Sequence, residues 1–190
     1  MKSDLEKACQ DYRRALDLPL PELIGSAADR ATASRAGAES AGWRLPPAES
    51  AALREWGVPV YEPEQADSVL LAGAVQAGGG PEIESHGLSA YRLGRFWDHT
   101  IAATETDGRV VGFPDELGDV VPLNSSVRAF QEISWRWYFA RRALLVLDAA
   151  DDERLGPMLQ TAVDLAHAID PKGAAEDPGD WWWEGVIGHW

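Results

Sequence analysis

Cysteine, long apolar runs and basic residues are all scarce in this 190-residue chain. The single cysteine, Cys9, excludes an internal disulfide and any multi-cysteine zinc site, and we expect its thiol to be a structural one on a helix. No apolar run approaches the ~20 residues that a membrane-spanning helix needs. Residues 1–16 carry scattered charges and do not resemble a secretory signal. We therefore expect a cytoplasmic protein without membrane contact.

Basic side chains number 17 against 31 acidic ones, which gives a formal net charge of -14. Binding to nucleic acid phosphates requires Lys and Arg, so we predict no direct contact with DNA or RNA. The same charge would attract a basic protein partner, although the solubility of an acidic protein explains it equally well. Nine tryptophans and 45% hydrophobic residues exclude disorder. We predict one domain over residues 1–190, with residues 1–45 as an N-terminal helical extension.

The strongest strand and turn signals lie in the middle of the chain. Residues 99–105 and 109–113 flank Asp107-Gly108, and Asp-Gly between extended runs predicts a β-hairpin. Asn124-Ser125-Ser126 then provides side-chain oxygens that can cap a helix, so both serines are interpreted as capping residues. Further extended segments are expected at residues 69–75, 89–95 and 120–123.

Apolar residues at helical spacing predict several helices. The expected helices cover residues 3–18, 46–56, 125–147, 157–169 and part of 180–190. The longest carries an apolar stripe from Val127 to Leu147, with Arg128, Arg136, Arg141 and Arg142 forming a basic flank outside it. The tryptophans of the tail are expected to dock on the domain's own sheet. The predicted fold is α+β, a single domain in which helices cover one face of a twisted, mainly antiparallel sheet.

Several short segments in this order resemble a known family. They are Leu93-Gly94, Asp107-Gly108-Arg109-Val110, Leu117-Gly118 and Leu123-Asn124-Ser125-Ser126-Val127 with Phe130. Together they resemble the fourth subgroup of the SUKH superfamily of bacterial immunity proteins, over residues 46–190. The resemblance implies the same α+β scaffold. It also implies a cognate protein toxin as partner, often a nuclease or a nucleic-acid deaminase of a polymorphic or contact-dependent system.

Catalytic, metal and cofactor signals are weak. None of the histidines has the paired spacing of a helical metal site; they are His86, His99, His167 and His189. Asp98 and His99 are the nearest approach to an acid and base pair, but neighbours on a strand point to opposite faces, so we expect them not to converge. The glycines at residues 78–80 precede Pro81 and Glu82 and lack a phosphate-loop ending. We predict no catalytic residue, no metal and no cofactor.

Candidate partner contacts are one aromatic anchor and two groups of acids. They are Trp97, then Asp115, Glu116 and Asp119, then Asp151, Asp152 and Glu153. The leading hypothesis is an immunity protein that occludes a cognate toxin. The alternatives are a SUKH-like adaptor that binds a host protein outside toxin conflict, and an unrecognised hydrolase that uses Asp98 and His99. The toxin, the interface and the oligomeric state are left open by the sequence.

Overall fold

A five-stranded antiparallel sheet forms the centre of the fold, and its strands are neighbours in chain order. The strands are β3 (Ile83–Ser85), β4 (Leu88–Phe96), β5 (His99–Thr104), β6 (Val110–Pro114) and β7 (Val121–Asn124). In this computed structural model the described residues are 2–25, 33–34, 40–59, 80–96, 98–116, 118–150, 152–176 and 181–188. Two further strands, β1 (Ala33–Ser34) and β2 (Val58–Pro59), pair separately. The strand predicted at residues 69–75 lies outside the described residues.

The predicted hairpin is the pair β5–β6, which is antiparallel. Its turn depends on Gly108, whose φ of +70° is a conformation that glycine adopts without steric cost. The Gly108 amide donates to the Thr104 carbonyl at 3.0 Å, and the Thr104 hydroxyl donates to Asp107 at 2.5 Å. The Asp-Gly signal therefore predicted this turn correctly, because glycine takes the positive φ and the aspartate side chain accepts a hydrogen bond within the turn.

A second hairpin, β3–β4, was not predicted. Its two turn residues, His86 and Gly87, have φ values of +53° and +72°, which is the pattern of a two-residue type I′ turn. Histidine in the first position is an uncommon choice, since non-glycine residues rarely adopt positive φ. The turn was missed because the sequence has His-Gly here and not the Asn-Gly or Asp-Gly signature that identifies such a turn.

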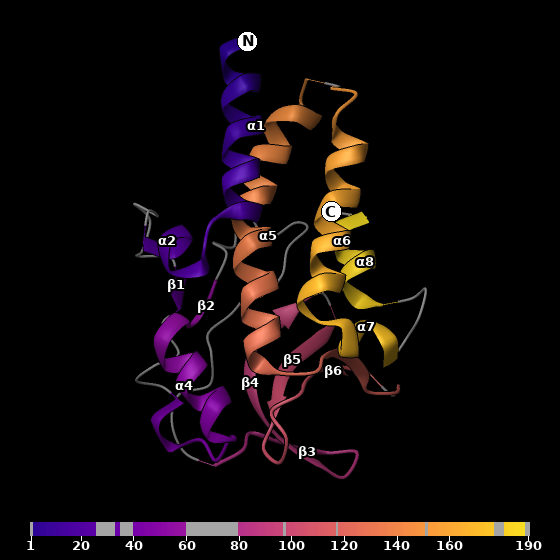
Figure 1. Cartoon of the computed structure of the whole chain (residues 1–190). Coiled ribbons are helices and arrows are strands. Elements are labelled where there is room, and N and C mark those ends of the chain that lie inside the picture. Colours follow the sequence, from indigo (N-terminus) through magenta and orange to yellow (C-terminus); the bar gives the residue numbers. More distant parts are fainter. Residues whose placement is uncertain are drawn as a thin grey trace.

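Helices pack against one face of the sheet and against one another (Figure 1). They are α1 (Lys2–Asp17), α2 (Leu20–Gly25), α4 (Pro47–Trp56), α5 (Val127–Asp148), α6 (Leu155–Ile169), α7 (Pro171–Glu176) and α8 (Trp182–Gly188), with a 3₁₀ turn η1 at Ser40–Gly42. The long helix α5 extends away from the sheet, and α1 and α6 lie alongside it (Figure 1). The predicted α+β fold is confirmed. None of the described helices is long and apolar enough to cross a membrane.

The apolar stripe of α5 forms the middle of the core. Every residue of the predicted stripe is buried: Val127, Phe130, Ile133, Trp137, Ala140, Leu144 and Leu147. The helix begins as expected, because the Ser126 side chain accepts a hydrogen bond from the Ala129 amide at 3.1 Å. A carboxylate from α4 adds to this cap, since Glu49 accepts from the Arg128 amide at 3.0 Å. Both acceptors satisfy amides that the first helical turn leaves unpaired.

The predicted basic flank of α5 was wrong at two of its four positions. Arg141 is 8% exposed. Arg136 turns toward α1, and its guanidinium donates to the carbonyls of Ala15, Leu16 and Leu18 at 3.1, 2.7 and 3.1 Å. The last carbonyls of a helix have no partner within the helix and carry partial negative charge, so an arginine there acts as a cap. Sequence periodicity could not show that α1 covers this face.

The N-terminal helix shares the main core through Ala8, Tyr12 and Ala15. The Tyr12 hydroxyl donates to the Met158 carbonyl of α6, and burial raises the pKa of this phenol. Cys9 lies half-buried on the same helix with a free thiol, as expected. The assignment of residues 1–45 as an extension of the domain stays a prediction.

The C-terminal tryptophans dock on the sheet, as predicted. The Trp181 indole N–H donates to the Leu123 carbonyl at 2.8 Å, and the Trp183 indole N–H donates to the Asn124 side chain at 2.9 Å. Both indoles are almost completely buried, so this helix is part of the core and is not an exposed anchor. The proposed cap Asp180 and the last residue, Trp190, lie outside the described residues.

Candidate functional site

The residues of the family-like motif form a buried polar network around Asp170, which is 1% exposed. One carboxylate oxygen accepts from the Asn124 side-chain amide and from the Ser125 backbone amide, both at 2.8 Å. The other accepts from the Ser125 hydroxyl at 2.6 Å and from the Gly173 amide at 3.0 Å. Ser126 is therefore the helix cap, whereas Ser125 bonds to a residue 45 positions later, which differs from the predicted capping role.

This network joins three parts of the chain that are distant in sequence. Asn124 donates to Asp170 and accepts from Trp183, so it connects the end of β7 to the α6–α7 junction and to α8. Gly173 is required by the close packing, because a Cβ atom there would lie 2.5 Å from the Asp170 carboxylate. These motif residues therefore have a structural role, because their hydrogen bonds join β7, the α6–α7 junction and α8.

The β4–β5 turn and the β6–β7 loop meet at one end of the sheet. The Asp115 amide donates to the Asp98 carbonyl at 2.8 Å, and the Asp115 carboxylate forms an ion pair with Arg95. We call the β6–β7 connection that carries Asp115, Glu116 and Asp119 the acidic loop. The backbone of Asp115 is thus bonded to the neighbouring turn, and its side chain is paired with strand β4.

The β3–β4 hairpin holds the acidic loop from a second side. Phe113 of β6 pairs with Thr100 of β5, and Thr100 pairs with Arg95 near the end of β4. His86 lies in the turn before the start of β4, so in a flat sheet it would be far from Phe113. Their rings are nevertheless 6.4 Å apart, and the His86 Nε2–H donates to the Gly118 carbonyl at 3.2 Å. The hairpin must therefore fold across the outer face of the sheet.

Apolar packing on that outer face explains why the hairpin folds over it. A second apolar cluster there is separate from the main core and consists of Ala90, Ala102, Val111 and Phe113, with Ile83, Leu88 and Val120 against it. The register irregularity between Arg92 and Gly94 in β4 is the kind of feature that lets a strand bend. The hairpin therefore contacts the β6–β7 connection through Val120 and through the His86 hydrogen bond.

Two carboxylates of the acidic loop lack a compensating charge. Asp115 is paired with Arg95, but among the described residues neither Glu116 nor Asp119 forms an ion pair, and both are exposed. The loop therefore presents two uncompensated negative charges on a backbone held by Asp98 and His86. Such an arrangement fits electrostatic recognition of a basic surface.

Asp152 and Glu153, from the second group of acids, lie at the opposite end of α5, in the α5–α6 turn (Figure 1). A 22-residue helix spans roughly 33 Å, so the two groups cannot form one small patch. Asp152 accepts from both Nε and Nη2 of Arg154 at 2.7 Å, and these hydrogen bonds lower the pKa of its carboxyl to about 2. Glu153 is exposed, whereas Asp151 and the predicted anchor Trp97 lie outside the described residues.

Asp98 and His99 do converge, which corrects the expectation from strand geometry. The His99 Nδ1 atom lies 2.8 Å from the Asp98 carboxylate, and this hydrogen bond lowers the pKa of Asp98. Contact is possible because Asp98 belongs to the turn and β5 begins only at His99. Among the described hydrogen bonds none joins His99 to a serine, threonine or cysteine, the residue types that a histidine base activates as nucleophiles. The described residues also contain no group of three potential metal ligands.

The fold and this site define an α+β protein in which a helix-backed antiparallel sheet supports an exposed acidic loop. The family model described as SUKH-4 immunity protein matches residues 21–189, so the chain belongs to this family and the resemblance is confirmed. No curated protein and no solved structure shows a significant match. Membership supports an immunity function with a toxin as the partner, and such families are in general not enzymes.

Proposed function

We propose that this immunity protein neutralises a cognate toxin of a polymorphic toxin system by binding it and occluding its substrate site. The observation that carries the proposal is the acidic loop, where Glu116 and Asp119 are exposed without an ion-pair partner in the described part of the chain. Two hydrogen bonds to the loop backbone, at Asp115 and Gly118, support the proposal, because a loop that is already ordered loses less conformational entropy on association. We propose that the two proteins meet in the cytoplasm.

The proposed toxin class is a nuclease or a nucleic-acid deaminase. Enzymes that bind nucleic acid need basic side chains along the substrate groove. A partner with a net charge of -14 would be attracted to such a groove and would compete with the substrate for it. Trp97, the residue before Asp98 in the sequence, is proposed as an aromatic anchor for the toxin.

The α5–α6 turn is proposed as a secondary contact. Asp152 is paired closely with Arg154, which reduces the charge that it offers to a partner. Glu153 is exposed. Asp151, two positions earlier in the sequence, is proposed as a further contact. Because this turn lies at the far end of α5, only a toxin that extends along the helix would reach both acidic groups (Figure 1).

The decisive experiment combines a binding assay with a matched charge control. The double variant Glu116→Lys/Asp119→Lys should slow association with the toxin encoded beside this gene, by about tenfold or more at low salt. The control is Glu6→Lys/Asp17→Lys, which makes the same change in net charge on exposed positions of α1. The control should retain most of the association rate.

Two outcomes would overturn parts of this proposal. Equal association rates for the loop variant and the α1 control would remove the acidic loop from the interface. Failure of the wild-type protein to co-purify with any neighbouring candidate toxin, or to rescue growth when co-expressed with it, would contradict toxin neutralisation itself. The first result concerns the surface and the second concerns the function, so the two are distinguishable.

A further inference from the structure

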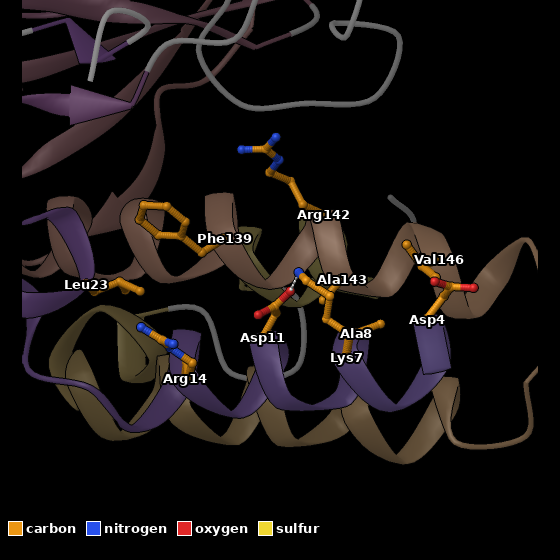
Figure 2. A pocket seen from close by; sticks show the side chains of 10 residues that line it. All are labelled: Asp4, Lys7, Ala8, Asp11, Arg14, Leu23, Phe139, Arg142, Ala143 and Val146. Atoms are coloured by element: carbon orange, nitrogen blue, oxygen red, sulfur yellow. Dashed lines mark hydrogen bonds and ion pairs between the residues drawn. The ribbon is translucent and has the colours of Figure 1, made fainter. Parts of the chain in front are cut away.

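A groove of about 470 Å³ is lined mainly by residues of α1 and α5 (Figure 2). Its apolar lining consists of Ala8, Leu23, Phe139, Ala143 and Val146. Val146 is 41% exposed and its neighbour Leu145 is 42% exposed, and these are the large exposed hydrophobic residues of the described part of the chain. An apolar groove of this kind is a candidate surface for docking another helix.

The α1 side of this groove carries four exposed charged residues in one line (Figure 2). They are Asp4, Lys7, Asp11 and Arg14. Their spacing of three, four and three residues places them on a single stripe of the helix. Along this stripe the charges alternate negative, positive, negative, positive.

This charge order becomes complementary to itself when the helix direction is reversed. If two copies of α1 lie antiparallel with a two-fold axis at the level of residue 9, Asp4 faces Arg14 of the other copy and Lys7 faces Asp11. Two-fold symmetry repeats each pair, so four oppositely charged pairs would form across the axis. A two-fold interface needs this kind of self-complementary patch.

We propose that the α1 stripe and the adjoining groove bind a second copy of this chain, with the two α1 helices antiparallel. The helix of the second copy would cover the exposed edge of Val146 and remove apolar surface from water. Helix α1 lies outside the residues that match the family model, so this inference is separate from the immunity function.

The charges of the groove also favour this occupant over others. Arg142 lies on the α5 side, so the lining has three basic and two acidic side chains on a protein whose net charge is -14. This face therefore lacks the acidic excess that would repel a second copy, and it is a poor match for a strongly basic toxin. Lys7 and Asp11 already form a 2.5 Å ion pair within the helix, but both are well exposed and could exchange partners.

The test uses two opposite charge reversals, Lys7→Glu and Asp11→Lys, with sedimentation velocity over a range of concentrations. In each single variant two of the four pairs become like-charge pairs, and we expect the dimer dissociation constant to rise about tenfold. An equimolar mixture of the two variants restores opposite charges at every pair. We therefore expect the mixture to associate as tightly as the wild type, as heterodimers.

The mixture separates an interface effect from a folding effect. Each reversal also creates a like-charge pair within its own helix, and mixing does not remove that repulsion. Recovery of association in the mixture can therefore come only from contacts between chains. A monomeric wild type at the highest attainable concentration, or a dimer that neither reversal weakens, would overturn the proposal. Weakened variants that fail to recover on mixing would overturn it as well.

Discussion

Removal of the Asp170 carboxylate should destabilise the protein more than any surface substitution, because four donors share this buried acceptor. In Asp170→Ala the amides of Ser125 and Gly173 and the side chain of Asn124 lose that acceptor. Each buried donor without a partner costs about 1–3 kcal/mol. The Ser125 hydroxyl can rotate, and removal of a buried charge recovers some solvation energy. We expect a loss of about 3–5 kcal/mol in the free energy of unfolding.

Asp170→Asn tests the same network with a side chain of nearly the same shape. Each carboxylate oxygen accepts from two donors, so the new NH₂ group faces donors in either orientation. The less costly orientation points it toward the Ser125 hydroxyl, which can rotate to accept, and away from Asn124. The Gly173 amide then remains unpaired. We expect a smaller loss of about 1–3 kcal/mol.

Urea unfolding followed by tryptophan fluorescence measures both variants, since Trp181 and Trp183 are buried beside this network. The control is Asp164→Ala, which removes an exposed carboxylate of α6 and should change stability by no more than about 0.5 kcal/mol. The reasoning is refuted if Asp170→Ala costs less than about 1 kcal/mol, or if Asp170→Asn costs more than Asp170→Ala.

Two further predictions concern a close contact and a surface ion pair. Gly173→Ala would place a Cβ atom 2.5 Å from Asp170 and should lower stability by about 2 kcal/mol, whereas Gly185→Ala meets no atom within 4 Å and should raise it by up to about 1 kcal/mol. Equal urea midpoints for the Gly173→Ala and Gly185→Ala variants would refute this prediction. The pKa of Asp152 is lowered to about 2 by Arg154, so its stabilising contribution is complete above pH ~4 and is lost as the pH falls toward 2. Asp152→Asn should reduce the fall in thermal stability over that range, and an unchanged pH profile would contradict the assignment.

Local signals predicted much of the fold because they depend on short-range geometry. The Asp107-Gly108 turn requires positive φ at glycine, and the Ser126 cap requires only an oxygen near the first turn of α5. The buried stripe of that helix follows from the helical period alone. These features are recognisable without knowledge of what lies on the other side of each element.

Contacts between distant segments were the main source of error. Arg136 was expected in solvent, yet it caps α1, which is more than a hundred residues earlier in the chain. Ser125 was interpreted as a cap, yet it bonds to Asp170. His86 was one of four dispersed histidines, yet it holds the acidic loop because β3 and β4 fold over the sheet. Periodicity within one element carries no information about such partners.

The fold class, the family and the acidic character of the protein could be read from the sequence alone. Turns, caps and apolar periods depend on neighbouring residues, and net charge depends only on composition. Only the tertiary structure decided which acids are free to meet a partner. Asp115 and Asp152 are paired with arginines, whereas Glu116 and Asp119 are exposed without an ion pair among the described residues. The physical reason is that the charge a carboxylate presents depends on which side chains packing brings beside it.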